Sequence, residues 1–164
     1  MTTLDSTDSN RKLASALGRV PSGLFILTVR RGPAETGMLV SWVQQCSFQP
    51  PRLSVALQRG RALNSWLVEE ASFVLNILDD TQTDMIAHFG KGFDPGQPAF
   101  EGLEVDLGAA AAPVLSEALA FLECRVVSRL VAGDHDLFIA EVLAGQLLGE
   151  GHPMVHVRKS GFHY

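Results

Sequence analysis

Cysteine is scarce in this sequence, whose 164 residues include only Cys46 and Cys124. The two lie far apart and match neither a zinc-binding spacing nor a CxxC redox motif. Each is surrounded by apolar or strand-forming residues, and a free cysteine behaves as a small hydrophobic side chain. We therefore expect two buried free thiols in a protein of a reducing compartment.

Long apolar runs and a cationic leader are also missing. A helix that spans a bilayer needs roughly 18 or more consecutive apolar residues, and no stretch approaches that length. The N-terminal segment is polar and acidic, without the basic and then apolar regions of a secretory signal. The net charge of −5 disfavours nucleic-acid binding, because phosphate backbones attract cationic surfaces. These absences predict a cytoplasmic protein that binds neither membrane nor nucleic acid.

Several motifs of catalysis and nucleotide binding are absent. There is no GxGxxG segment and no GxxxxGK[ST] segment, so neither a Rossmann site nor a phosphate loop is expected. No GxSxG segment supplies a nucleophile for Ser-His-Asp hydrolysis. His152 and His156 are four residues apart, but they flank Pro153 in a strand-like segment instead of sharing one helix face. We expect no metal site.

Short strand patterns dominate what is present. Hydrophobic residues make up 46% of the chain, and its 15 glycines and 8 prolines are spread along it, which favours many short elements. Consecutive strands lack the alternating helices of a parallel sheet. We predict a mainly β protein, an antiparallel barrel with small flanking helices. It forms one domain, residues 11–164, after a disordered segment, residues 1–10.

The predicted elements follow from hydrophobic periodicity and turn residues. Helices are predicted for Asn10–Leu17, Leu63–Glu70 and, from a capping box that begins at Thr81, up to Phe89. Strands are predicted for Leu24–Val29, Gly37–Ser47, Leu53–Leu57, Ser72–Leu78, Phe121–Leu130, Leu137–Leu143, Met154–Val157 and Gly161–Tyr164. The strand Leu137–Leu143 is apolar on both faces apart from Glu141, which is typical of a central strand or a subunit interface.

The stretch Thr36–Leu57 places hydroxyl, amide and indole groups among apolar neighbours. Such a stretch in a hydrophobic protein lines a ligand, a partner or water. A flavin needs backbone polar groups along its ring edge, an apolar wall for one ring face and donors for its phosphate. The strand edge and Trp42 supply the first two. The candidate phosphate donors are Ser41, Ser47, Arg59, Arg61, Asn64 and Ser65, the last two near the start of a predicted helix.

Each of these residues also has a simpler interpretation. Trp42 is equally consistent with core packing, Arg59 and Arg61 with a solvated turn, and Asn64 with an exposed helix face. The same holds for His135, which follows the turn residues Gly133 and Asp134, because a turn histidine is usually solvated. His135 is therefore either a solvated turn residue or a binding or catalytic residue.

Several segments, in this order, resemble the flavin reductase-like domains, which are split β-barrel proteins that bind FMN. They are Gly18, Gly23–Thr28, Gly37–Trp42, Ser47–Pro51, Phe73–Leu78, His88–Gly90, Ala120–Cys124 and Gly133–His135. The similarity covers residues 13–164. The segments MLVSWVQQCSFQPP and RKSGFHY are most similar to the flavin reductase domain at the C-terminus of flavodiiron proteins.

The resemblance implies a Greek-key split β-barrel, a homodimer, and FMN near the subunit interface, with FAD as the alternative flavin. It implies ring contacts from Leu39, Val40, Ser41, Trp42, Val43, Cys46 and Ser47. It implies phosphate contacts near Ser41, Arg59, Asn64 and Ser65, with Phe89 close by. His135 would then help to seat the nicotinamide of NAD(P)H against the flavin.

The resemblance implies an NAD(P)H:flavin oxidoreductase that supplies reduced flavin or electrons to a partner oxygenase or diiron protein. Hydride transfer depends on positioning and needs no general base, which fits the absence of a catalytic triad. A non-catalytic electron carrier that binds FMN and never meets NAD(P)H would have much the same sequence. A split barrel that binds haem or another cofactor is a third interpretation.

Overall fold

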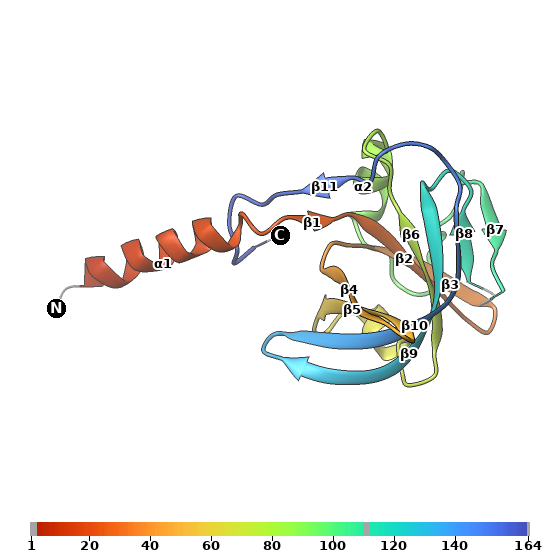
Figure 1. Ribbon diagram of the computed structural model, residues 1–164, viewed down its shortest axis with the longest axis horizontal. Coiled ribbons are helices and arrows are strands. Elements are labelled where there is room, and N and C mark those ends of the chain that lie inside the picture. Colours follow the sequence, from red (N-terminus) through yellow and green to blue (C-terminus); the bar gives the residue numbers. More distant parts are fainter. Residues whose placement is uncertain (1–2, 110–111, 164) are drawn as a thin grey trace.

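The computed structural model describes residues 3–109 and 112–163 (Figure 1). Its helical elements are α1 (Thr3–Leu17), the 3-10 helix η1 (Ala62–Ser65) and α2 (Thr83–Phe89). Its strands are β1 (Ser22–Gly23), β2 (Phe25–Arg31), β3 (Ala34–Val40), β4 (Val43–Phe48), β5 (Pro51–Gln58), β6 (Ser72–Ile77), β7 (Val105–Leu107), β8 (Pro113–Leu115), β9 (Ala120–Ala132), β10 (His135–Leu147) and β11 (Val155–His156). The predicted mainly β class is confirmed.

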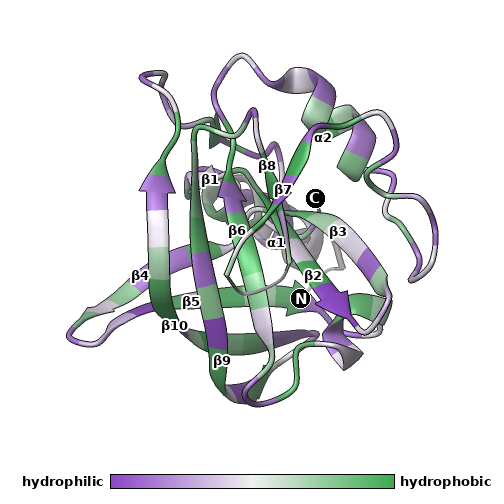
Figure 2. Ribbon diagram, turned by 90° about the vertical axis from the view of Figure 1, so that its right-hand side faces the viewer, coloured by the Kyte–Doolittle hydropathy of each residue, from purple (hydrophilic) through white to green (hydrophobic). Residues whose placement is uncertain are grey.

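One antiparallel sheet of seven strands, in the order β3-β2-β6-β9-β10-β5-β4, forms the body of the molecule. The sheet does not close, because no pairing joins β3 to β4 within the described residues. Only Ser41 and Trp42 connect these two edge strands, and three Cα–Cα steps span about 11 Å at most, so the edges lie close together at that end. Figure 2 shows the sheet curling round its interior, with α2 across one end. This is the predicted split barrel.

The interior is filled by the inward-facing residues of the strands. In β5, Leu53, Val55 and Leu57 are buried while Arg52 and Ser54 between them are partly exposed, the alternation of a half-buried strand. They pack with fully buried side chains of the central strands, including Phe73, Cys124, Val126 and Phe138. A second cluster, around Ile26, Met85, Phe89 and Phe100, joins α2 to the outer face of the sheet.

The N-terminal helix replaces the disorder predicted for residues 3–10, and it begins at Thr3 instead of Asn10. It extends away from the sheet (Figure 1), so its surface is largely solvated. Asp8 forms ion pairs with Arg11 and Lys12, each at 2.6 Å, on the i,i+3 and i,i+4 spacing that stabilises helices. The spacing of these charged residues favours a helix, whereas the apolar periodicity used for the prediction does not include them. No helix in the described part is long and apolar enough to cross a bilayer.

Three other predicted elements differ from the structure. The strand expected over Gly37–Ser47 is two strands, interrupted at Ser41–Trp42, and the first begins earlier, at Ala34. The helix expected over Leu63–Glu70 is only the single turn η1. No strand forms over residues 161–163, and Tyr164 lies outside the described residues.

Candidate functional site

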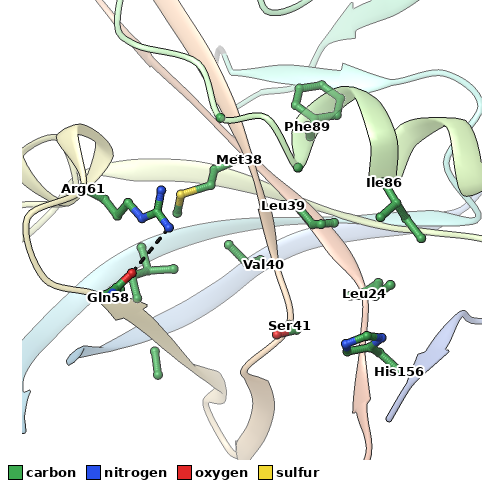
Figure 3. Close-up of a pocket in the computed structure, with 14 residues that line it drawn as sticks. Leu24, Met38, Leu39, Val40, Ser41, Gln58, Arg61, Ile86, Phe89 and His156 are labelled. Atoms are coloured by element: carbon green, nitrogen blue, oxygen red, sulfur yellow. Dashed lines mark hydrogen bonds between the residues drawn. The ribbon is translucent and has the colours of Figure 1, made fainter. Parts of the chain in front are cut away.

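A cavity of about 430 Å³ opens between β3, the end of β5 and α2. Figure 3 shows Met38, Leu39 and Val40 following one another along β3, with Phe89 and Ile86 from α2 beside them. We call it the central cavity. Its apolar lining and its size are those of a site for a small molecule with a planar ring system.

A glycine lets α2 approach β3 at this cavity. A Cβ at position 37 would fall 2.7 Å from Cε1 of Phe89, far inside van der Waals contact. The absence of a side chain at Gly37 therefore lets the buried Phe89 ring pack on the strand. Phe89 lines the cavity, as the sequence predicts for a residue close to the ligand.

Polar groups gather at one side of the central cavity. Arg61 Nη2 donates to Gln58 Oε1 at 3.4 Å, and both residues line the cavity (Figure 3). Arg61 also lines an adjoining pocket of about 190 Å³, together with Lys91 and Asp94. We call this the side pocket. An apolar cavity with two cations at one side suits a planar group that carries an anionic tail.

Two of the predicted phosphate ligands, Arg59 and Asn64, lie beside a buried carboxylate. Asp136 on β10, whose side chain is 1% exposed, accepts a hydrogen bond from Arg129 Nη2 at 2.6 Å and one from Asn64 Nδ2 at 3.2 Å. Arg59 Nε lies 3.8 Å from its other oxygen. Asn64 also donates to the carbonyl of Gln58 at 3.0 Å, so it is buried and not on an exposed helix face. This network fixes the turn that carries Gln58 and Arg61.

The Asp136 network predicts a pH dependence of stability. The hydrogen bond from Arg129, and then the charge of Arg129, hold the pKa of Asp136 below its ordinary value, against the opposing effect of desolvation. A carboxylate with a lowered folded-state pKa stabilises the protein above its unfolded-state pKa, about 4, and this stabilisation is lost as pH falls through the folded-state pKa. Asp136→Asn should therefore be less stable than wild type at neutral pH. The difference should shrink as the pH falls below about 4.

Urea unfolding from about pH 3 to pH 7 measures this difference. Asp134→Asn is the matched control, because the Asp134 carboxylate is exposed and its pKa is lowered chiefly by its hydrogen bond with His135. A constant gap between wild type and Asp136→Asn across the range would contradict the assignment.

A second cavity, of about 450 Å³, lies beside the first, and Gln58 lines both. We call it the C-terminal cavity, because the segment after Val157 forms part of its wall. The His135 ring lies 4.7 Å from the Trp42 ring, centroid to centroid, and His135 Nδ1 is 2.7 Å from Asp134 Oδ1. His135 is buried, so its interpretation as a solvated turn residue is wrong. Trp42 and His135 thus come together although they are distant in sequence.

Of the residues predicted to contact a ligand, five line the central cavity: Leu39, Val40, Ser41, Arg61 and Phe89. The others lie elsewhere. Val43 packs against the core, Ser65 is exposed and donates to the carbonyl of Ala62 at 2.8 Å, and Cys46 and Ser47 lie near the end of the β4–β5 hairpin. Their predicted ligand contacts stay predictions.

The prediction of two buried thiols is half right. Cys46 is exposed, because it lies on the edge strand β4, so its predicted burial is wrong. Cys124 is fully buried in the core, and this burial raises the pKa of its thiol to about 12. Both cysteines are free.

Sequence analysis missed cavity residues that come from four separate segments: Met38, Gln58, Ile86, Lys91, His156 and Arg158. Ile86 belongs to a predicted helix, and Gln58 directly precedes the turn that carries the candidate phosphate donors Arg59 and Arg61. The sequence therefore held a signal for these two. For Lys91, His156 and Arg158 there is no local signal, because only the packed fold brings them to the cavities.

Comparisons with known proteins show relatives of this chain in sequence and in fold. Diflavin flavoprotein A 1 of Synechocystis sp. is 40% identical over 163 residues, which cover 98% of this chain and 28% of that protein. The chain spans about a quarter of the length of the curated relatives it matches.

Among solved structures, the styrene monooxygenase flavin reductase of Pseudomonas putida S12 superposes with a TM-score of 0.74 at 28% identity, covering 87% of this chain and 90% of that one. BorF, the flavin reductase component of a bacterial two-component tryptophan halogenase, superposes with a TM-score of 0.79 at 25% identity, covering 90% of this chain and 92% of that one. The family model described as the flavin reductase like domain matches residues 17–163. The chain therefore belongs to the flavin reductase-like domain family.

Proposed function

We propose that the central cavity holds FMN, with the ring system against β3 and the phosphate toward Arg61 and Lys91. β3 is an edge strand, so its outer backbone groups have no strand partner in the described part and are available to the polar ring edge. Leu39, Ile86 and Phe89 supply apolar surface for the ring faces. FAD is the alternative flavin, with its further phosphate and adenosine extending past the side pocket.

The C-terminal cavity is the proposed site of NAD(P)H. It adjoins the central cavity at Gln58, and it carries His135 and the Trp42 ring, which suit a planar aromatic ligand. When bound, the flavin accepts a hydride from the reduced nicotinamide. The chain itself supplies positioning: His135 is held by Asp134 on one side and by Trp42 on the other, so its ring has a fixed place at the cavity wall.

The function best supported is NAD(P)H:flavin oxidoreductase, which supplies reduced flavin or electrons to a partner oxygenase or diiron protein. The observation that carries it is the pair of adjoining cavities, one apolar with cations at its side and the other walled by His135. The second candidate is an electron-carrying flavoprotein without NAD(P)H activity. The observation behind it is that this chain matches only about a quarter of the length of each diflavin flavoprotein.

The chain is also proposed to form a homodimer. Large apolar side chains at the ends of β4, β9 and β10 are exposed, among them Phe48 at 89%, Leu147 at 68% and Val131 at 61%. Leu147 and Val131 lie at opposite ends of the β9–β10 pair and form no single patch, so the homodimer rests on the resemblance to the family. A cytoplasmic location remains a prediction.

Steady-state oxidation of NADH and NADPH by the purified protein, with FMN added, tests the proposal. His135→Ala should lower kcat/KM for NAD(P)H by about ten- to a hundredfold, because a positioning contact is lost, while Kd for FMN changes less than about twofold. His152→Ala is the control, because His152 is exposed and lines neither cavity.

Two outcomes would count against this assignment. If FMN binds to wild type and neither dinucleotide is oxidised above background, the electron-carrier function replaces the reductase. If His135→Ala loses FMN binding and turnover equally, His135 belongs to the flavin site and not to the C-terminal cavity.

A further inference from the structure

The guanidinium of Arg158 is held in the wall of the C-terminal cavity, and none of the described residues serves as its counterion. Its Cζ lies 4.8 Å from the centroid of the Trp42 ring, and the residue is half-buried. No carboxylate of residues 3–109 or 112–163 lies within ion-pair distance of it. Contact with an aromatic ring steadies a guanidinium but does not neutralise its charge.

The backbone fixes where Arg158 stands. Its N–H donates to the carbonyl of Gly18 at 3.1 Å, and the N–H of Gly161 donates to the carbonyl of Ala14 at 2.6 Å. A Cβ at position 18 would fall 2.7 Å from the Arg158 carbonyl oxygen, so the absence of a side chain at Gly18 permits this approach. The segment that carries Arg158 is therefore tied to the base of α1, and its arginine is presented from a fixed point.

The charge balance of the cavity favours an anion. Asp134 is the one acidic residue among the described residues of its lining, and this carboxylate already accepts the hydrogen bond of His135. Arg158 supplies the opposite charge, and no carboxylate of the described residues lies within ion-pair distance of it. The planar, forked guanidinium matches phosphate oxygens in geometry and charge, and it binds them in pairs of hydrogen bonds.

We propose that Arg158 binds a phosphate of the nicotinamide dinucleotide in the C-terminal cavity and is a specificity-determining residue for this co-substrate. The proposal rests on the proposed function, which places NAD(P)H in this cavity. NADH and NADPH share a pyrophosphate, and NADPH adds a 2′-phosphate. Either group has the chemistry that Arg158 recognises.

The test is a set of three variants of the full chain with FMN bound: Arg158→Gln, Arg158→Lys and, as the matched control, Lys159→Gln. Lys159 is the next residue, is exposed and lines none of the cavities described above, so its loss removes the same net charge outside the cavity. Steady-state kinetics with NADH and with NADPH give KM and kcat. Titration with ADP-ribose and with 2′,5′-ADP measures binding without turnover.

Arg158→Gln should raise KM about tenfold or more with little change in kcat, because one charge-assisted pair is lost. Arg158→Lys should recover part of the loss. If KM rises with both dinucleotides and ADP-ribose binds more weakly, the pyrophosphate is the group that Arg158 binds. If KM rises only with NADPH and 2′,5′-ADP binds more weakly, the 2′-phosphate is the group that Arg158 binds. Equal values for Arg158→Gln and Lys159→Gln in kinetics and binding would overturn the proposal.

The outcome separates this inference from the function on which it rests. If wild type oxidises neither dinucleotide yet binds one fragment in an Arg158-dependent way, the reductase function fails and the anion site stands. If wild type turns over and Arg158→Gln matches the control, the function stands and the inference fails.

Discussion

Replacing Arg61 with glutamine is expected to raise Kd for FMN about ten- to a hundredfold. Arg61 lines both the central cavity and the side pocket, and no carboxylate of the described residues forms an ion pair with it. A hydrogen bond to a charged group contributes about 1.5–3 kcal/mol, which corresponds to this range in Kd. Quenching of flavin fluorescence on titration of FMN into the protein measures the change.

Arg59 provides the matched control, since it stands two residues away in the same turn and carries the same charge. Its Nε lies 3.8 Å from Asp136, and it lines none of the cavities described above. Arg59→Gln should change Kd for FMN less than about threefold, because its loss removes only long-range attraction. A larger effect from Arg59→Gln than from Arg61→Gln would return the phosphate site to the Arg59–Asn64 position predicted from the sequence.

Replacing Asn76 with alanine is expected to lower the free energy of unfolding by about 3–5 kcal/mol. Asn76 is fully buried in β6, where its Nδ2 donates to the Ile26 carbonyl at 3.1 Å and to Thr28 Oγ1 at 3.4 Å. Its Oδ1 accepts the N–H of Leu115 at 2.8 Å. Each buried group left without a partner costs about 1–3 kcal/mol, and the missing side chain leaves a cavity as well.

Denaturant unfolding measures this loss, with Asn10→Ala as the control. Asn10 lies on the exposed surface of α1, where alanine is the better helix former, so its substitution should be neutral or slightly stabilising. A loss below about 1 kcal/mol for Asn76→Ala would mean that water or a shifted backbone replaces its hydrogen bonds.

The strands and the second helix were predictable because their signals are local. The residues of β5 alternate between buried and exposed, and the apolar side of Thr83–Phe89 packs on the sheet, as their sequence patterns indicate. The family was likewise readable, since its segments occur in order along the chain. Within the site, Ser41 and Phe89 lie in those segments and line the central cavity, while their contacts with a ligand stay predictions.

The environment of Arg59 and Asn64, two of the candidate phosphate donors, was not predictable, because it depends on the partner strand across the sheet. The amide of Asn64 can donate a hydrogen bond to a phosphate, and Asn64 lies near the predicted phosphate site. In the structure, however, this amide donates to Asp136, which is 72 residues away in sequence. The antiparallel pairing of β10 with β5 places Asp136 opposite Leu57, and this register makes the contact. Nothing near Asn64 in the sequence reports that pairing.

By itself the sequence determined that the chain folds as an antiparallel β protein, because periodicity and turn chemistry are properties of neighbouring residues. The order of its motifs carried the resemblance to the flavin reductase-like family. The tertiary structure alone decided which cations face a cavity: Asp136 engages Arg59, while Arg61 and Arg158 have no such partner in the described part. The reason is physical. A buried carboxylate must be paired, and the curl of the sheet determines which arginine reaches it.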